Sequence, residues 1–251
     1  LIEDGLLTGV DCSLVAEPTA AFLGLSGAPV ISLGARGTYI YFVDFHGKAA
    51  HASQPETGIN AAEQACRFAL AATCKQPSLP GALGHGSLCL LKMSADGGAC
   101  SVPDFCRVTI HRHVNELETE SLVLEEAEHF CQEAGVSCKH QIYLRETPSA
   151  GSRCYPPYLV EAANPWAQAL TAAVRKVSGK EPILHPMDSI GDFNYLGTRL
   201  DGAPCLVLGP QGANLHGADE WVSLSSLQEV TEIFYQFLRC TMAASSGLIK
   251  E

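Results

Sequence analysis

The sequence lacks the features of a membrane protein or a nucleic-acid-binding protein. No apolar stretch approaches the roughly 18 uninterrupted residues that a membrane-spanning helix needs, and no charged-then-apolar signal segment stands at the start. Basic residues form no run, and the formal net charge of the 251 residues is −11 at pH 7. Because nucleic acid attracts basic surfaces, we expect neither nucleic acid nor a membrane as a partner.

The sequence also lacks a cysteine framework. Its 11 cysteines are an odd number, stand singly, and never form a Cys-x-x-Cys pair. Several of them lie inside apolar helix or strand patterns, where a free cysteine behaves as a small hydrophobic residue: Cys66, Cys89, Cys131 and Cys205. We therefore expect a reducing, cytoplasmic compartment, with neither disulfide bonds nor a thiolate zinc site.

Internal repeats and low-complexity segments are absent as well, and the composition is that of a globular protein. Hydrophobic residues make up 47% of the chain and charged residues 17%, which argues against a disordered chain. A length of 251 residues is enough for one large domain or two small ones.

The middle of the chain, residues 37–150, has the pattern of a separate α/β domain. Strand-like segments at 38–45, 87–93, 107–114 and 136–145 alternate with amphipathic helical segments at 58–75 and 119–134. The order βαββαβ predicts a ferredoxin-like sandwich, in which both helices cover one face of a four-stranded sheet and leave the other face free.

The flanking parts, residues 1–36 and 151–251, predict another α/β unit, with a mixed sheet and helices. Residues 1–10 have the apolar spacing of the end of a helix, and residues 12–16 and 205–208 indicate short buried strands. Helices are expected at 164–178 and 223–242, and the second should bury Leu227, Val230, Phe234, Phe237 and Leu238. Residues 148–157 are expected to connect the two parts of the chain.

Potential metal ligands follow two of the predicted strands. Glu17 comes directly after residues 12–16, and the loop after residues 205–208 carries His216, Asp219 and Glu220. Loops that leave the carboxyl ends of strands are where open α/β sheets bind ligands, and imidazole with carboxylates suits a metal ion. The alternatives are a loop histidine that only forms hydrogen bonds and a solvated carboxylate.

Five segments together resemble a known family. They are Glu17-Pro18-Thr19, GKAAHASQPETGINAA at 47–62, Val102-Pro103-Asp104 leading to Arg112, Gly191-Asp192, and GPQGANLHGADEWV at 209–222. In this order and spacing they resemble the zinc-dependent deacylases and exopeptidases that include acetylornithine deacetylase, succinyl-diaminopimelate desuccinylase and glutamate carboxypeptidase. The resemblance covers nearly the whole chain.

The resemblance implies an architecture and a set of site residues. Residues 37–150 would be a lid or dimerisation domain inserted into a catalytic domain made of 1–36 and 151–251. Glu17 and His216 would each bind one of two zinc ions, with cobalt or manganese as substitutes, and Glu220 and Asp192 would support them.

Three residues of the lid would act on the substrate. His51 would reach a partner's active site and steady the developing oxyanion, Arg112 would hold a substrate carboxylate, and Cys100 would contact substrate where the family often has asparagine. The plainer interpretations are a solvated loop histidine for His51 and a surface charge for Arg112.

The sequence departs from the family in one respect that bears on activity. The family's first half supplies a His-x-Asp motif, a metal-bridging aspartate and a Glu-Glu pair, whereas the only adjacent glutamates here are Glu125-Glu126, in a predicted lid helix. We therefore expect a carboxyl-terminal portion of a hydrolase, inactive by itself and with weak or no metal binding. The alternatives are a non-catalytic remnant used for dimerisation or binding, and a single non-catalytic metal held by Glu17, His216 and another carboxylate.

With these residues, the expected function is that of a metal-dependent amidohydrolase. Two divalent ions lower the pKa of a bridging water and polarise an amide carbonyl. The substrate would be a small N-acyl amino acid or dipeptide bearing a carboxylate, and the protein would act as a homodimer through the lid.

Overall fold

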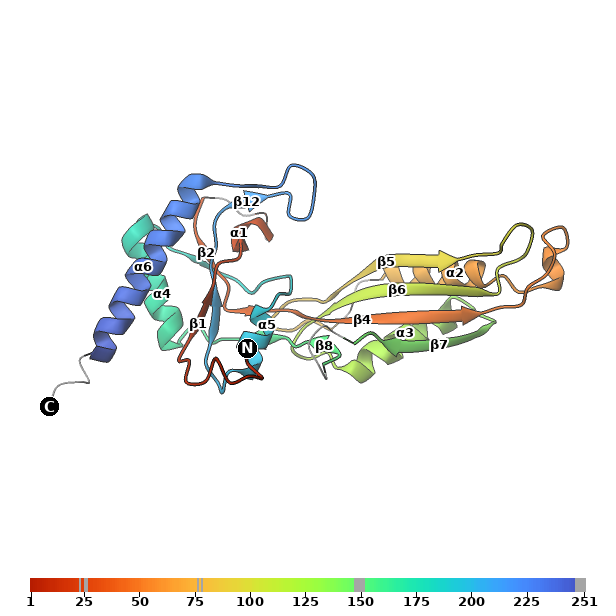
Figure 1. The fold of residues 1–251 in the computed structure, drawn as a ribbon, viewed down its shortest axis with the longest axis horizontal. Helices are drawn as coiled ribbons and strands as arrows, with labels where there is room; N and C mark the ends of the chain where they lie inside the picture. Colours follow the sequence, from red (N-terminus) through yellow and green to blue (C-terminus); the bar gives the residue numbers. More distant parts are fainter. Residues whose placement is uncertain (23, 25–26, 76, 78, 147–151, 247–251) are drawn as a thin grey trace. The chain divides into compact units, whose positions relative to one another are not determined.

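The protein is an α/β protein that divides into two compact units. The computed structural model describes residues 1–22, 24, 27–75, 77, 79–146 and 152–246 (Figure 1). Unit 1 consists of Leu1–Arg36 and Pro156–Glu251, and unit 2 is Gly37–Tyr155. The α/β class predicted from the sequence is confirmed. The role of unit 2 as a lid or dimerisation domain stays a prediction, and part of the predicted connection at 148–157 lies outside the described residues.

Unit 2 contains the predicted βαββαβ order. Its strands β5, β6, β4 and β7 lie side by side in that order, and every neighbouring pair is antiparallel. The short strand β8 also pairs with β4. The elements are β4 Gly37–His46, η1 Pro55–Thr57, α2 Ala61–Thr73, β5 Ser87–Ala95, β6 Phe105–Val114, α3 Glu120–Glu133, β7 Lys139–Leu144 and β8 Cys154–Tyr155.

The helices of unit 2 begin where the sequence provides a cap, and both pack on one face of the sheet. The Asn60 side chain accepts hydrogen bonds from two backbone N–H groups at the start of α2, and Thr119 accepts one at the start of α3. Alternate residues of β4 point at the helices, and Tyr41, Val43 and Phe45 are fully buried there (Figure 1). The residues between them face the side of the sheet that neither helix covers.

A buried ion cluster lies on the helix-covered face of unit 2. Arg112 of β6 has no exposed surface, and its guanidinium pairs with Glu118 and Glu126. The Nε–Oε1 distance to Glu126 is 2.9 Å, and Glu118 also accepts a hydrogen bond from the Asn115 backbone N–H at 2.9 Å. A Cβ at Gly86 would collide with the guanidinium, so this position requires glycine. The cluster therefore ties β6 to the following turn and to α3.

Unit 1 is built from short strand pairs and three longer helices. Strands β1 and β11 pair in parallel, as do β2 and β10, whereas β3 and β9 pair antiparallel and so do β12 and β13. The elements are β1 Ser13–Val15, α1 Thr19–Phe22, β2 Val30–Ile31, β3 Gly34–Ala35, β9 Tyr158–Leu159, α4 Pro165–Ser178, β10 Ile183–Leu184, α5 Phe193–Arg199, β11 Cys205–Val207, β12 Gly212–Ala213, β13 Trp221–Val222 and α6 Leu224–Ser246.

Helices α4 and α6 lie side by side over the core of unit 1 (Figure 1). Asn164 caps α4, Pro165 stands at its first turn, and Gly179 ends it with a φ of 68°, as the sequence predicts. The buried core joins these helices to Ile31 and Leu206 of the parallel strands. Within the described ranges, none of the helices is both long enough and apolar enough to cross a bilayer.

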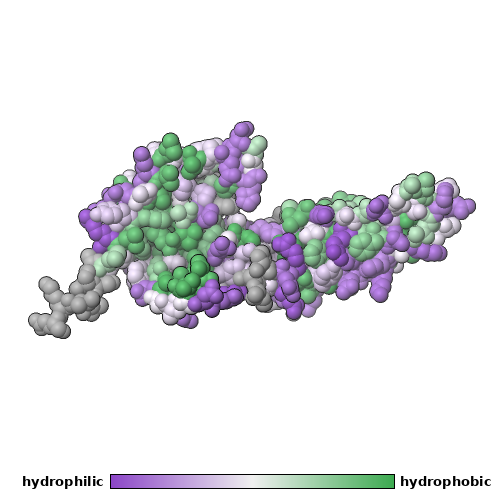
Figure 2. All heavy atoms as spheres, in the orientation of Figure 1, coloured by the Kyte–Doolittle hydropathy of each residue, from purple (hydrophilic) through white to green (hydrophobic). Residues whose placement is uncertain are grey.

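Two expectations for unit 1 are wrong. Residues 2–9 form turns rather than the end of a helix. Helix α6 buries Val230 and Phe237, but Leu227 and Leu238 remain 44% and 51% exposed. Figure 2 shows apolar side chains at the surface near the start of α6. The apolar residues of α6 thus extend around more of the helix than its contact with α4 covers.

Replacing Arg112 by methionine should lower the free energy of unfolding by about 3–5 kcal/mol, because Glu118 would keep a buried charge without a partner. Urea denaturation followed by circular dichroism measures the loss. The matched control is Arg153→Met, which removes an ion pair with Glu120 whose partners are 61% and 41% exposed. That change should lower stability by about 0–1 kcal/mol, and equal losses in both variants would contradict the role of the cluster.

Candidate functional site

Glu17 lies where the carboxyl ends of two parallel strands meet. Strand β1 ends two residues before it, and Val15 pairs with Val207 of β11. The Leu208 N–H donates to the Val15 carbonyl at 3.0 Å. A Cβ at Gly209 would overlap the Glu17 carbonyl, so only glycine allows this close approach of the two backbones. The segments that carry Glu17 and His216 therefore leave the same edge of the sheet, as the sequence predicts.

His216 lies in the loop of the small hairpin formed by β12 and β13. Asn214, His216 and Asp219 all have positive φ values, of 60°, 61° and 58°. The Asn214 side-chain amide donates to the Asp219 carbonyl at 3.2 Å, which closes the loop. Non-glycine residues adopt this left-handed backbone rarely, and such residues gather at functional sites. The loop holds the His216 imidazole at the surface, where a ligand can reach it.

The described residues do not fit a complete metal site. Glu17 and His216 are donors of the types that zinc prefers, but no group of three or more His, Cys, Asp or Glu side chains in the described part of the chain is placed to hold a metal. Glu220 is exposed, and Asp192 stands exposed at the start of α5, where its side chain caps no backbone N–H. The support of metal ligands by Glu220 and Asp192 stays a prediction.

Asn194 is a buried polar residue that the sequence reasoning missed. Its amide nitrogen donates to the carbonyls of Arg36 and Pro156 at 2.8 and 2.9 Å, and its oxygen accepts from the Gly191 N–H at 2.9 Å. It thereby fixes the loop before Asp192. It also joins the two chain segments of unit 1, because Arg36 ends the first segment and Pro156 begins the second. A lone asparagine in a helical pattern gives no signal of this role in the sequence.

His51 has one ring nitrogen that can only accept a hydrogen bond. The backbone N–H of Ser53 donates to Nδ1 at 3.2 Å, and the Ser53 hydroxyl lies 2.8 Å from the same nitrogen. A backbone N–H cannot accept, so Nδ1 is the acceptor and the proton of the neutral ring is on Nε2. The exposed His51 side chain therefore has an Nε2–H donor available to a ligand.

Cys100 is held beside the segment that carries His51. The Ala52 N–H donates to the Cys100 carbonyl at 2.9 Å, and the Val102 N–H donates to the Ala50 carbonyl at 2.8 Å. Both side chains, His51 and Cys100, are exposed. Unit 2 therefore brings two of the predicted site residues together at one loop cluster, and their contact with substrate stays a prediction.

The prediction that Arg112 binds a substrate carboxylate is wrong in this structure. Its side chain has no exposed surface, and Glu118 and Glu126 occupy its guanidinium. Strand alternation gives the reason, because Arg112 shares its face of β6 with the buried residues Val108, Ile110 and Val114. The prediction of a solvated surface charge fails for the same reason.

The model of peptidase family M20/M25/M40 matches residues 14–239 of this chain. The chain therefore belongs to this family. The resemblance inferred from the motifs around Glu17, His51 and His216 is confirmed at the level of the family.

Similar proteins include hydrolases of several substrates. The chain is 31% identical over 157 residues to N-formyl-4-amino-5-aminomethyl-2-methylpyrimidine deformylase of Bacillus subtilis, covering 57% of this chain and 36% of the deformylase. It is 22% identical to succinyl-diaminopimelate desuccinylase of Colwellia psychrerythraea, covering 90% of this chain and 54% of that protein. The chain spans about half the length of the curated desuccinylases that it matches.

The fold is similar to that of a solved peptidase. A tripeptidase of Staphylococcus aureus superposes with a TM-score of 0.72 at 14% identity, covering 94% of this chain and 58% of that chain. At this identity the likeness shows a common fold only. It agrees with the α/β class and with the family match.

The proton of the neutral His51 ring should be found on Nε2. Long-range 1H–15N NMR spectra, recorded at a pH where the rings are neutral, identify the protonated nitrogen of each histidine. His185 is the internal control, because its Nδ1 lies 2.6 Å from the Pro186 carbonyl and must donate there. The Ser53→Ala variant keeps the backbone donor and should keep the proton on Nε2. A His51 ring protonated on Nδ1 would contradict the hydrogen-bond assignment.

Proposed function

We propose that the chain belongs to a hydrolase that cleaves a C–N amide bond of a small N-acyl amino acid or dipeptide-like substrate. The family match supports this function, as do the activities named for the similar proteins, which include a desuccinylase, a deformylase and a tripeptidase. The observation that carries the proposal is the His51 ring, whose Nδ1 is occupied by Ser53 in a side chain that is exposed.

His51 would act on the carbonyl oxygen of the scissile amide. As the carbonyl carbon becomes tetrahedral, negative charge develops on its oxygen, and a positioned N–H donor stabilises this charge more than it stabilises the ground state. The Ser53 hydrogen bonds would fix the ring so that no tautomer change is needed before the donor acts. Cys100, held beside this segment, would line the same substrate region.

Glu17 would supply a carboxylate ligand to one of two metal ions and His216 an imidazole ligand to the other, with zinc as the proposed ion and cobalt or manganese as substitutes. When bound, such an ion polarises the carbonyl and lowers the pKa of a bound water. The parallel pairing of β1 with β11 supports this assignment, because it directs both segments from one edge of the sheet. Since Arg112 is buried, the proposal of a carboxylate-bearing substrate rests on the relatives.

The test is hydrolysis by the purified gene product that carries this sequence, supplied with zinc, cobalt or manganese. The substrates are N-succinyl and N-acetyl amino acids and dipeptides. His51→Gln should lower kcat by about 10²–10³-fold with little change in KM, because the donor acts only in the transition state. The matched control is His46→Gln, an exposed histidine of the same unit, which should leave both constants unchanged. No hydrolysis of any member of the panel, or equal losses in the two variants, would refute the proposal.

The second candidate function is a dimerisation or binding module, and one observation favours it. Strand β5 is an edge of the unit 2 sheet, and Leu90 and Leu91 in its middle are 36% and 53% exposed. An edge strand with unpaired backbone groups and apolar side chains is a template for pairing with another chain. We propose that two copies of unit 2 pair through β5.

Under this proposal the wild-type chain should elute with twice the mass of one chain in size-exclusion chromatography with light scattering. Leu91→Lys should shift it to the monomer, because a charge would be buried at the junction. Leu159→Lys, at a residue of unit 1 that is 47% exposed, is the control and should leave the mass unchanged. A wild-type monomer at all accessible concentrations would end the dimer proposal.

A further inference from the structure

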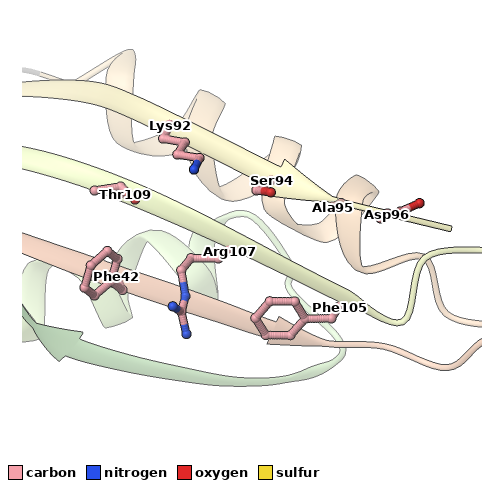
Figure 3. Close-up of a pocket in the computed structure, with 8 residues that line it drawn as sticks. All are labelled: Phe42, Lys92, Ser94, Ala95, Asp96, Phe105, Arg107 and Thr109. Carbon is pink, nitrogen blue, oxygen red and sulfur yellow. The ribbon is translucent and has the colours of Figure 1, made fainter. Parts of the chain in front are cut away.

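A pocket of about 510 Å³ lies on the face of the unit 2 sheet that α2 and α3 leave uncovered (Figure 3). Its volume falls in the range of small-molecule sites. The register of β5 and β6 places Lys92 opposite Thr109, and Ser94 opposite Arg107, so these side chains share the open face. Phe42 of β4 and Phe105 of β6 are the aromatic residues of the lining.

Arg107 is held in place in the pocket without any ligand. Its Nε and Nη2 donate to the two oxygens of Asp44, each at 2.7 Å, and the Tyr143 hydroxyl donates to the same carboxylate at 3.0 Å. Arg107 holds the pKa of the Asp44 carboxyl below its usual range, so this pair stays charged near neutral pH. The Arg107 side chain is still 43% exposed, and its two hydrogen bonds to Asp44 use only Nε and Nη2. A donor fixed in this way loses little entropy when it binds an anion.

The pocket combines this fixed donor with aromatic walls. The Arg107 guanidinium carbon lies 5.1 Å from the centre of the Phe42 ring and 5.8 Å from that of Phe105. Phe105 is 39% exposed, so part of its ring is open to contact by a ligand. A planar ring can pack on Phe42 and Phe105 while it remains next to a cation.

Lys92 adds a charge that the protein itself does not neutralise. It is exposed, and no carboxylate in the described ranges forms an ion pair with it. Its flexible ammonium group can pair with a carboxylate as a point charge, whereas Nε and Nη2 of Arg107 already donate to Asp44. Although the overall charge of the chain is −11, this face thus carries Lys92 in addition to the Arg107 that pairs with Asp44.

Asp96 limits the charge that the pocket accepts. It lines one end, where its Oδ1 accepts the Gly98 backbone N–H at 2.7 Å. Its negative charge would repel a second carboxylate on the same molecule. Because Arg107 is already paired with Asp44, Lys92 is the cation of the lining that has no carboxylate partner among the described residues, and the lining offers a charge partner to at most one carboxylate.

We propose that this pocket binds a small aromatic monocarboxylate. The ring would pack against Phe42 and Phe105, and the carboxylate would accept hydrogen bonds from the Lys92 ammonium and from Arg107 Nη1. None of Glu17, His51 and His216 lines the pocket, so the inference does not rest on the proposed hydrolase function.

The test is a 1H–15N NMR titration of the purified protein with benzoate. The backbone amides of Lys92, Ser94 and Arg107 should shift in a saturable manner. Benzamide has the same shape without the charge and should bind about tenfold more weakly, as should cyclohexanecarboxylate, which lacks the aromatic ring. Lys92→Gln should weaken benzoate binding about tenfold, whereas Lys139→Gln, an exposed lysine of β7, should not change it.

A second variant tests the role of Asp96. Terephthalate, with two carboxylates, should bind more weakly than benzoate to the wild-type protein, and Asp96→Asn should remove most of that difference. Benzoate shifts that spread over the surface without saturation, equal binding of benzamide, or an unchanged affinity in Lys92→Gln would each overturn the proposal. All of these readouts are independent of hydrolytic activity.

Discussion

The parallel pairing of β1 with β11 is the contact on which unit 1 depends. It joins residues 13–15 to residues 205–207 and is completed by the close approach of Gly209 to the Glu17 carbonyl. Through this pairing, a glutamate near one end of the sequence and a histidine hairpin near the other leave the same edge of a sheet. The buried faces of helices α4 and α6 then pack on Ile31 and Leu206 of the same layer. No local feature of either segment could place them together.

In unit 2, the alternation of side chains along β6 decides which cations a ligand can reach. Arg107 and Arg112 lie five positions apart, so they point to opposite faces of the sheet. Arg112 lies under the helices and balances two glutamates, whereas Arg107 lies on the open face and keeps almost half of its surface exposed. One strand thus supplies a cation that stabilises the unit and another that is available for binding.

Most of the secondary structure was predictable from the sequence, because hydrophobic periodicity and caps such as Asn60, Thr119 and Asn164 are local signals. The burial of Arg112 was also implied by its alternation with Val108, Ile110 and Val114, but the motif led to a substrate role instead. The Asn194 contacts and the Ser53 bond to His51 were beyond reach, since both depend on the folded placement of the chain. The metal assignment stayed open because two donor residues of suitable chemistry do not define a coordination geometry.

The insertion of residues 37–155 into the sequence of unit 1 sets an order for folding during synthesis. All strand pairs of the main unit 2 sheet lie within these residues, so this unit can fold as soon as that segment has left the ribosome. Strand β1, although made earlier than β11, can form this pairing only after β11 has been translated, a delay on the order of 10 s at common elongation rates. The β1–β11 pairing of unit 1 therefore forms later than the main sheet of unit 2 can form.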